Sequence, residues 1–126
     1  AVLPTFEAQK SGHILATSSV AGLKVYPGCA VYCGTKWAVK AIMEGLRMES
    51  AQAGTNIRTA TIYPAAVQSE LVAGITNPEM AEAMRGLYDA YEIPAERVAN
   101  VVAFALNQPE DTNISEFTLG PTTQPW

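Results

Sequence analysis

The sequence predicts an α/β fold built on a small parallel sheet. Short apolar runs of strand type alternate along the chain with longer amphipathic segments of helical period, an order typical of βαβ units. The first run is continuously apolar, as in strands covered on both faces, and the second is rich in β-branched residues. We therefore expect about three parallel strands flanked by helices, at residues 13–17, 56–63 and 114–119.

The elements of the first half follow from local sequence signals. Residues 1–9 look like the last turns of a helix that is already under way. A loop rich in Gly and Pro, over 18–30, separates the first strand from a long helix over 31–53. Gly54 suits the C′ position after that helix, and Pro64 is expected to stop the second strand. Because apolar and small residues cover more than one face of the long helix, we expect it to be deeply buried or packed against another subunit.

The second half is predicted to be mainly helical before its last strand. A helical stretch over 69–74 precedes a helix with Asn77 at its N-cap and Pro78 at its first position. A further helix starts at Pro94, and the segment 120–126 has turn chemistry. The helix that opens at Pro78 carries a single apolar stripe: Met80, Met84, Leu87 and Tyr91.

Length and composition exclude several classes of protein. The chain has 126 residues, enough for one domain or part of one, and its 48% hydrophobic residues exclude a disordered chain. The net charge is −4 and no basic stretch occurs, so the sequence gives no support to nucleic-acid binding. The apolar runs are too short to span a bilayer, and no secretion signal is recognisable. These features favour a cytoplasmic protein that neither spans a membrane nor binds nucleic acid.

The two cysteines predict neither a redox motif nor a metal site. Cys29 and Cys33 are four residues apart, which is not the CxxC spacing, and the single histidine, His13, is distant in sequence. We interpret both cysteines as reduced residues in small-residue positions, and His13 as structural. No metal is expected.

The sequence around Tyr32 and Lys36 has the makings of a proton-transfer site. Lys36 lies four residues after Tyr32 on the predicted long helix, so the two side chains share a face. The lysine charge favours the phenolate, and a phenol tuned in this way can protonate an alkoxide or deprotonate an alcohol. Ser19, 13 residues before the tyrosine, could hydrogen-bond the same substrate oxygen. The spacing alone is a weak signal, and the alternative is an ordinary surface helix with a partly buried tyrosine.

Three motifs, taken in order, resemble the C-terminal half of the short-chain dehydrogenase/reductase family. They are the run 12–22 ending in Ser-Ser-Val-Ala-Gly, the segment Tyr-Cys-Gly-Thr-Lys at 32–36, and Ile-Tyr-Pro-Ala-Ala-Val-Gln-Ser at 62–69. The resemblance covers essentially the whole chain and implies a Rossmann-like, doubly wound parallel sheet. The ending over 117–124 looks more like the branch that acts on 3-hydroxy acids, serine and related small hydroxy acids or aldehydes.

The resemblance implies a role for each matching position. Tyr32 would be the general acid/base, Lys36 would tune it and hydrogen-bond the nicotinamide ribose, and Ser19 would orient the substrate carbonyl. Pro64 and Val67 would line the nicotinamide, with the Val67 backbone meeting its carboxamide, and Ser69 would cap the same region. Hydride would pass between the cofactor and a small carbonyl or secondary alcohol, with NADP somewhat favoured over NAD. The family usually has Gly where this chain has Ala65, and Thr where it has Ser69, and we expect the hydroxyl contact to survive the second change.

The resemblance also implies that part of the family's domain is not in this sequence. The glycine-rich phosphate loop belongs to the first half of the fold, and none of the nine glycines forms G-x-G-x-x-G after a strand. We therefore expect residues 1–126 to be the C-terminal part of one NAD(P)-binding domain whose N-terminal half is absent. The competing hypothesis is an inactive fragment or an assembly module.

Two further surfaces have expected roles. The segment 70–92 occupies the position of the family's substrate-binding lid, although an ordinary amphipathic helix explains its apolar stripe equally well. The helix over 31–53 resembles the family's dimer-forming helix. We therefore expect a homo-oligomer, either a dimer or a tetramer.

Overall fold

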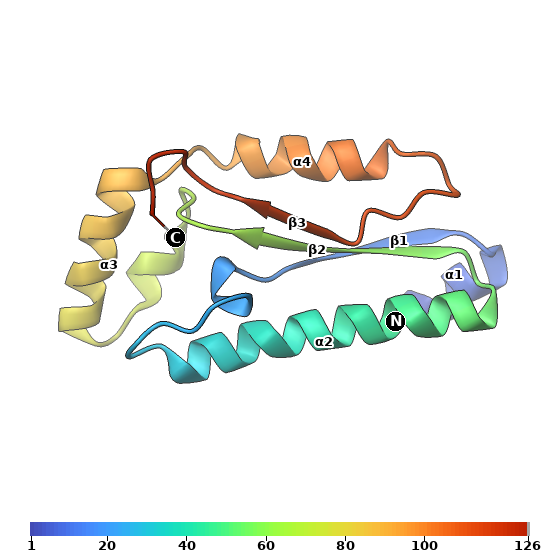
Figure 1. Ribbon diagram of the computed structural model, residues 1–126, viewed down its shortest axis with the longest axis horizontal. Helices are drawn as coiled ribbons and strands as arrows, with labels where there is room; N and C mark the ends of the chain where they lie inside the picture. Colours follow the sequence, from blue (N-terminus) through green and yellow to red (C-terminus); the bar gives the residue numbers. More distant parts are fainter. Residues whose placement is uncertain (126) are drawn as a thin grey trace.

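A computed structural model describes residues 1–125, and Trp126, at the end of the predicted turn segment, lies outside the described residues. The strands and the longer helices carry α and β labels, and two short 3₁₀ helices are labelled η (Figure 1). In chain order the elements are α1 (Leu3–Gln9), β1 (Gly12–Thr17), η1 (Val20–Gly22), α2 (Ala30–Ala53), β2 (Ile57–Pro64), η2 (Glu70–Gly74), α3 (Pro78–Tyr91), α4 (Glu96–Leu106) and β3 (Glu116–Leu119).

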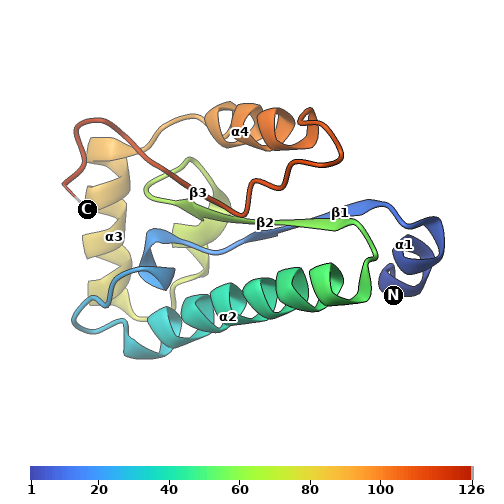
Figure 2. The same cartoon turned by 45° about the vertical axis from the view of Figure 1, so that its right-hand side comes forward.

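The strands form one parallel sheet with the order β1-β2-β3. Helix α2 covers one face of the sheet and α4 covers the other, while α3 stands across the carboxyl ends of the strands (Figures 1 and 2). The central strand β2 supplies most of the core, where Ala60, Ile62 and Tyr63 are buried. The predicted α/β fold, a Rossmann-like sheet of three parallel strands flanked by helices, is confirmed.

Pro64 is the last residue of β2, whereas the sequence predicted that the strand would end at Tyr63. It pairs with Leu119, and the following amide of Ala65 donates to the Leu119 carbonyl at 2.9 Å. Backbone groups alternate between the two sides of a strand. Because the Ala65 amide faces β3, an N–H at Pro64 would face the side of β1. Strand β1 has already ended at Thr17, opposite Ile62. The strand therefore loses no ladder hydrogen bond at this proline.

Four other predicted boundaries shift by a few residues. The stretch 69–74 is a 3₁₀ helix over Glu70–Gly74 with Ser69 as its N-cap, rather than part of a regular helix. The helix expected from Pro94 begins at Glu96, and the third strand is the shorter Glu116–Leu119. The second strand begins at Ile57 because Asn56 has a left-handed backbone, with φ of 56°.

Helix α2 is more exposed than the predicted alternative of a deeply buried helix requires. Only Cys33, Met43 and Ser50 on this helix are buried, whereas Val31 is 83% and Ile42 67% exposed. Deep burial of α2 within this chain is therefore wrong. The alternative of packing against another subunit stays a prediction.

Among residues 1–125, no helix is both long enough and apolar enough to cross a lipid bilayer.

Candidate active site

The predicted site residues of the strands meet at one edge of the sheet. Strands β1 and β2 run parallel with Thr17 opposite Ile62, and the Ser18 amide donates to the Ile62 carbonyl at 2.7 Å. Ser19 and Pro64 each lie two residues beyond this pair. The sheet therefore delivers both residues to the same carboxyl edge, where parallel α/β sheets bind their ligands.

Ser19 is held at the start of the first 3₁₀ helix. Its side-chain oxygen accepts a hydrogen bond from the Ala21 amide at 3.2 Å, so it acts as the N-cap of η1. This contact uses only a lone pair, and the hydroxyl hydrogen is left to donate. The side chain is half-buried, so Ser19 is both fixed in place and accessible to a small molecule.

A second serine, Ser18, connects this loop to the helix that carries Tyr32 and Lys36. Its buried hydroxyl donates to the Lys36 carbonyl at 2.9 Å. Gly22 allows the close approach, because a Cβ at this position would lie 2.6 Å from Ser18 Oγ and 2.9 Å from the Lys36 oxygen. No role was predicted for Ser18, although the Ser-Ser pair followed by Gly22 was a signal for it.

Tyr32 and Lys36 lie on adjacent turns of α2. The Lys36 ammonium is 5.6 Å from the centroid of the Tyr32 ring, within the range of a cation–π interaction. The same ammonium donates to the Thr17 carbonyl at the end of β1, at 3.5 Å. Tyr32 is 39% exposed. The structure thus places an exposed phenol beside a fixed positive charge at the carboxyl edge.

The loop after β2 is held by the rest of the chain. The Ala66 amide donates to Gln124 Oε1 at 3.0 Å, and Val67 forms an isolated parallel bridge with Ile93. In that bridge Ile93 donates to the Ala66 carbonyl and accepts from the Gln68 amide, so the backbone groups of Val67 are directed away from Ile93. Gln124 was not predicted as a site residue, and a glutamine in a turn segment carries no motif that would have identified it.

Ser69 lies further along the loop, at the border of a hollow between η2 and α3. Its oxygen accepts from the Leu71 amide at 3.4 Å. The hollow has a volume of about 250 Å³ and is lined by Ser69, Val72, Ala73, Arg85, Tyr88, Asp89 and Glu92. Ser69 therefore borders a hollow whose lining includes Tyr88 of α3 but not Tyr32.

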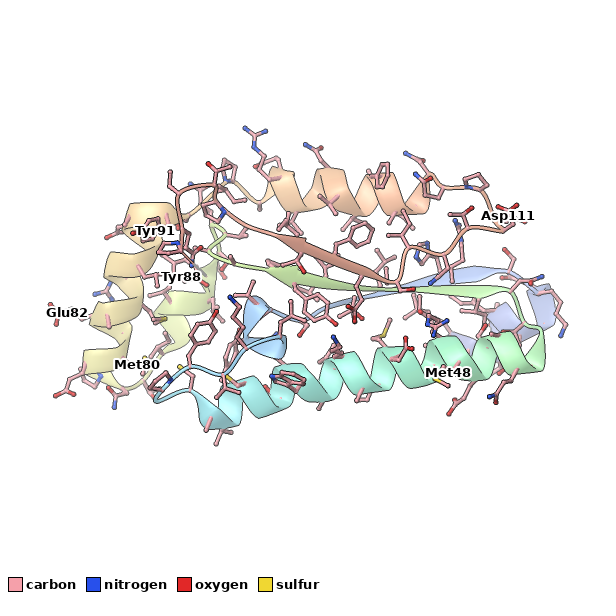
Figure 3. The ribbon with its side chains drawn as sticks, viewed as in Figure 1. Met48, Met80, Glu82, Tyr88, Tyr91 and Asp111 are labelled. Atoms are coloured by element: carbon pink, nitrogen blue, oxygen red, sulfur yellow. The ribbon has the colours of Figure 1, made fainter. Side chains whose placement is uncertain are left out.

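Tyr88 lies on the face of α3 that is turned toward the strand ends, whereas Glu82 points away (Figure 3). Burial raises the pKa of Tyr88, and the neighbouring Tyr32 and Glu92 raise it further. Met80, one end of the predicted apolar stripe, lies beside Gly28 of the loop before α2. Helix α3 therefore packs over the entrance of the site.

The two cysteines are not joined by a disulfide, and the described residues form no cluster of metal ligands. Both cysteines are free, and Cys33 is buried in the core, as expected for reduced residues. Among the described residues, no group of three or more His, Cys, Asp or Glu side chains could hold a metal ion.

Curated relatives match the chain over nearly its whole length. An uncharacterized oxidoreductase of Listeria innocua is 66% identical over all 126 residues, and one of Staphylococcus saprophyticus is 47% identical over 98% of the chain. The aligned region makes up 51% and 50% of these proteins, so the chain spans about half the length of the curated relatives it matches.

Solved structures match the same fold. The closed form of a serine dehydrogenase in complex with NADP+ superposes with a TM-score of 0.87 at 28% identity, over 99% of this chain and 50% of that one. The serine dehydrogenase of Escherichia coli superposes with a TM-score of 0.76 at 26% identity, over 99% and 47%. The sequence profile described as short chain dehydrogenase matches residues 1–80, more than half of the chain. The chain therefore belongs to the short-chain dehydrogenase family of oxidoreductases.

Proposed function

We propose that the whole protein is an NAD(P)-dependent oxidoreductase that transfers hydride between a nicotinamide cofactor and a small carbonyl or secondary alcohol. Tyr32 is its general acid/base. The observation that carries this proposal is the Lys36 ammonium 5.6 Å from the Tyr32 ring, at the edge that also receives Ser19.

The residues proposed to transfer the proton are all in this chain. In the reducing direction the Tyr32 hydroxyl gives its proton to the oxygen of the substrate, and in the oxidising direction the phenolate removes that proton. Lys36 stabilises the phenolate through its charge. Ser19 donates its free hydroxyl hydrogen to the same substrate oxygen and so holds the carbonyl in place.

The residues around Pro64 fit a nicotinamide. The backbone groups of Val67 are directed away from their bridge partner, and the hydrogen bond from Ala66 to Gln124 fixes the loop. We assign Pro64, Val67 and Ser69 to the wall of this subsite, and Lys36 to the ribose hydroxyls. When bound, the nicotinamide would supply or accept the hydride. NADP is favoured over NAD because similar solved structures include NADP complexes.

We propose further that residues 1–126 are the C-terminal part of a single domain. The chain exposes 7772 Å², whereas a compact protein of its 13.4 kDa mass exposes about 6,500 Å². Strand β1 is at an edge of the sheet, and its apolar residues Ile14, Leu15 and Ala16 are only half-buried. An N-terminal half that adds strands beside β1 would cover them and bring the phosphate-binding loop. The complete protein is proposed to be a cytoplasmic homo-oligomer.

The substrate is proposed to be a small hydroxy acid or the corresponding carbonyl compound. The superposition with two serine dehydrogenases supports this choice. Helix α3 acts as the lid, with Tyr88 on its side turned toward the strand ends and Met80 against the loop before α2. A half-buried stripe that contains two methionines can adapt its shape to a small substrate.

The test is a turnover assay of the whole protein with a panel of serine, 3-hydroxy acids and short aldehydes. Each substrate is offered with NAD(H) and NADP(H), and the absorbance of the reduced cofactor is followed. We expect saturable turnover of at least one hydroxy acid. Absence of turnover across the panel with either cofactor, in protein that is folded, would contradict the proposal.

The 126-residue chain alone is proposed to be inactive. It contains the proton-transfer residues without a phosphate-binding loop, so most of the cofactor affinity is expected to be missing. Titrations of NADH and NADPH, followed by fluorescence, compare cofactor binding by the 126-residue chain with binding by the whole protein. Micromolar binding by the chain would refute this part of the proposal and favour a self-sufficient module.

A further inference from the structure

Three side chains from three different elements meet behind the candidate active site. The Tyr63 hydroxyl, from β2, donates to Glu116 Oε1, from β3, at 2.8 Å. The Lys40 ammonium, from α2, lies 3.4 Å from the same carboxylate oxygen. It also lies 5.7 Å from the centroid of the Tyr63 ring. Each side chain therefore interacts with both of the others.

Tyr63 is the most rigid member of this cluster. It is among the largest fully buried side chains, with 0% of its surface exposed, on the central strand of the sheet. Glu116 is opposite Thr61 in the register, so Tyr63 reaches it across the strands along a diagonal. Burial raises the pKa of Tyr63, and the hydrogen bond to Glu116 raises it further, so the phenol remains a donor at any working pH.

The two ends of the cluster adjoin the two parts of the candidate active site. Lys40 is one helical turn beyond Lys36 and two turns beyond Tyr32 on α2. Tyr63 directly precedes Pro64, the first residue assigned to the nicotinamide wall. A contact between Lys40 and Tyr63 therefore connects the proton-transfer turn of α2 to the loop after β2.

The second ion pair of the same helix provides a contrast. Arg47 and Glu44 are both on α2, with a distance of 2.7 Å between Nη2 and Oε1, and the ion pair of Arg47 lies within this one helix. An exposed pair of this kind contributes little to stability and fixes no neighbouring element. The Lys40–Glu116–Tyr63 cluster differs because it joins α2 to both β2 and β3, and because its third member, Tyr63, is buried.

We propose that Tyr63, Glu116 and Lys40 are positioning residues that hold the Tyr32–Lys36 turn at its working distance from the Pro64–Val67 loop. This inference rests on the proposed function of that site. Without the cluster, α2 can shift along the sheet. Lys36 then spends less time beside Tyr32, and the phenol is less well aimed at the substrate oxygen, so catalysis falls although no reacting group is removed.

The test compares Tyr63→Phe, Glu116→Gln and Lys40→Met with the control Arg47→Met, all in the whole protein. Wild type and Tyr32→Phe first establish whether the proposed reaction occurs. In the three cluster variants we expect kcat to fall by about tenfold, and KM for the substrate to change less. Arg47→Met should match wild type in both quantities.

Amide hydrogen exchange gives a readout that does not depend on activity. The cluster variants are expected to exchange faster than wild type over 30–40 and 64–69, and the control is not. If exchange and kcat both stay within twofold of wild type while only the melting temperature falls, the cluster is merely stabilising and the proposal is wrong. Should Tyr63→Phe fail to fold, the two variants at the partly exposed Lys40 and Glu116 decide the question. Unchanged exchange overturns the proposal even if the proposed reaction is not found.

Discussion

At the scale of single residues, Gly22 allows the loop that carries Ser18 and Ser19 to approach α2 closely. The Ser18 hydroxyl reaches the Lys36 carbonyl at 2.9 Å only because no side chain stands between η1 and the helix. A methyl group at position 22 would lie closer to both oxygens than van der Waals contact allows. The turn that carries Lys36 is thus positioned in part by the absence of a side chain.

Gly22→Ala is predicted to destabilise the whole protein. The added Cβ must displace buried backbone, which costs about 1–3 kcal/mol and lowers the melting temperature by several degrees. Gly86→Ala, on α3, is the matched control, because a Cβ there meets nothing within 4 Å among the described residues, and alanine favours the helix. Thermal unfolding of both variants checks the difference. Equal melting temperatures would show that η1 is not tightly packed against α2.

His13 is a second residue with an unusual environment. Both ring nitrogens are buried and have no hydrogen-bond partner among residues 1–125. Burial lowers the pKa of His13 below its ordinary 6.5, and the facing residue Arg58 lowers it further. The folded protein therefore holds the neutral imidazole, in agreement with the structural role expected from the sequence.

Protonation of His13 is predicted to destabilise the fold at acidic pH. The unfolded chain takes up the proton at about its ordinary pKa of 6.5 while the folded chain resists it, so stability falls as pH drops below 6.5. His13→Gln removes this titration. Melting temperatures of wild type and variant are compared at about pH 7.5 and about pH 5.5. A smaller drop in the variant is expected, and identical drops would mean that His13 does not contribute.

At the scale of elements, α2 presents an apolar surface that this chain does not cover. Val31 and Ile42 lie along one side of the helix, and both are largely exposed. Small residues, including Gly34, Ala38 and Ala41, lie near them and would let another helix approach closely. This surface is the basis of the proposed self-association.

Ile42→Glu is predicted to dissociate the oligomer. A charge in the centre of an apolar interface leaves an unpaired carboxylate on association, which is strongly unfavourable. Size-exclusion chromatography with light scattering measures the mass of the whole protein. Ala83→Glu, at an exposed position of α3, adds the same charge elsewhere and should leave the mass unchanged. An oligomer that survives Ile42→Glu would exclude this face as the interface.

Most elements could be predicted because each is encoded locally. The apolar run before Ser18 predicted the bounds of β1 to within a residue or two. The caps at Gly54 and Asn77 did the same for the end of α2 and the start of α3. The role of Gln124 could not be predicted, because its partner Ala66 is distant in sequence and only the folded sheet brings them together. The same holds for Glu116, whose contacts with Tyr63 and Lys40 require all three elements to be in place.

At the scale of the whole molecule, the carboxyl edge of the sheet organises every proposed role. Register places Ser19 and Pro64 at one edge, α2 brings Tyr32 and Lys36 to it, and α3 stands across it (Figure 1). The chain belongs to the short-chain dehydrogenase family, and we propose that its oxidoreductase chemistry takes place at this edge. The central claim is that Tyr32 performs the proton transfer there.

Substitution of Tyr32 by phenylalanine in the whole protein tests that claim most directly. The ring and its packing remain while the transferable proton is lost, so kcat is predicted to fall by about 10²–10⁴-fold. Cofactor affinity and melting temperature should stay close to wild type. Tyr26→Phe, in the loop before α2, is the matched control and should retain kcat within a few-fold. A Tyr32→Phe protein that keeps wild-type kcat would contradict the account.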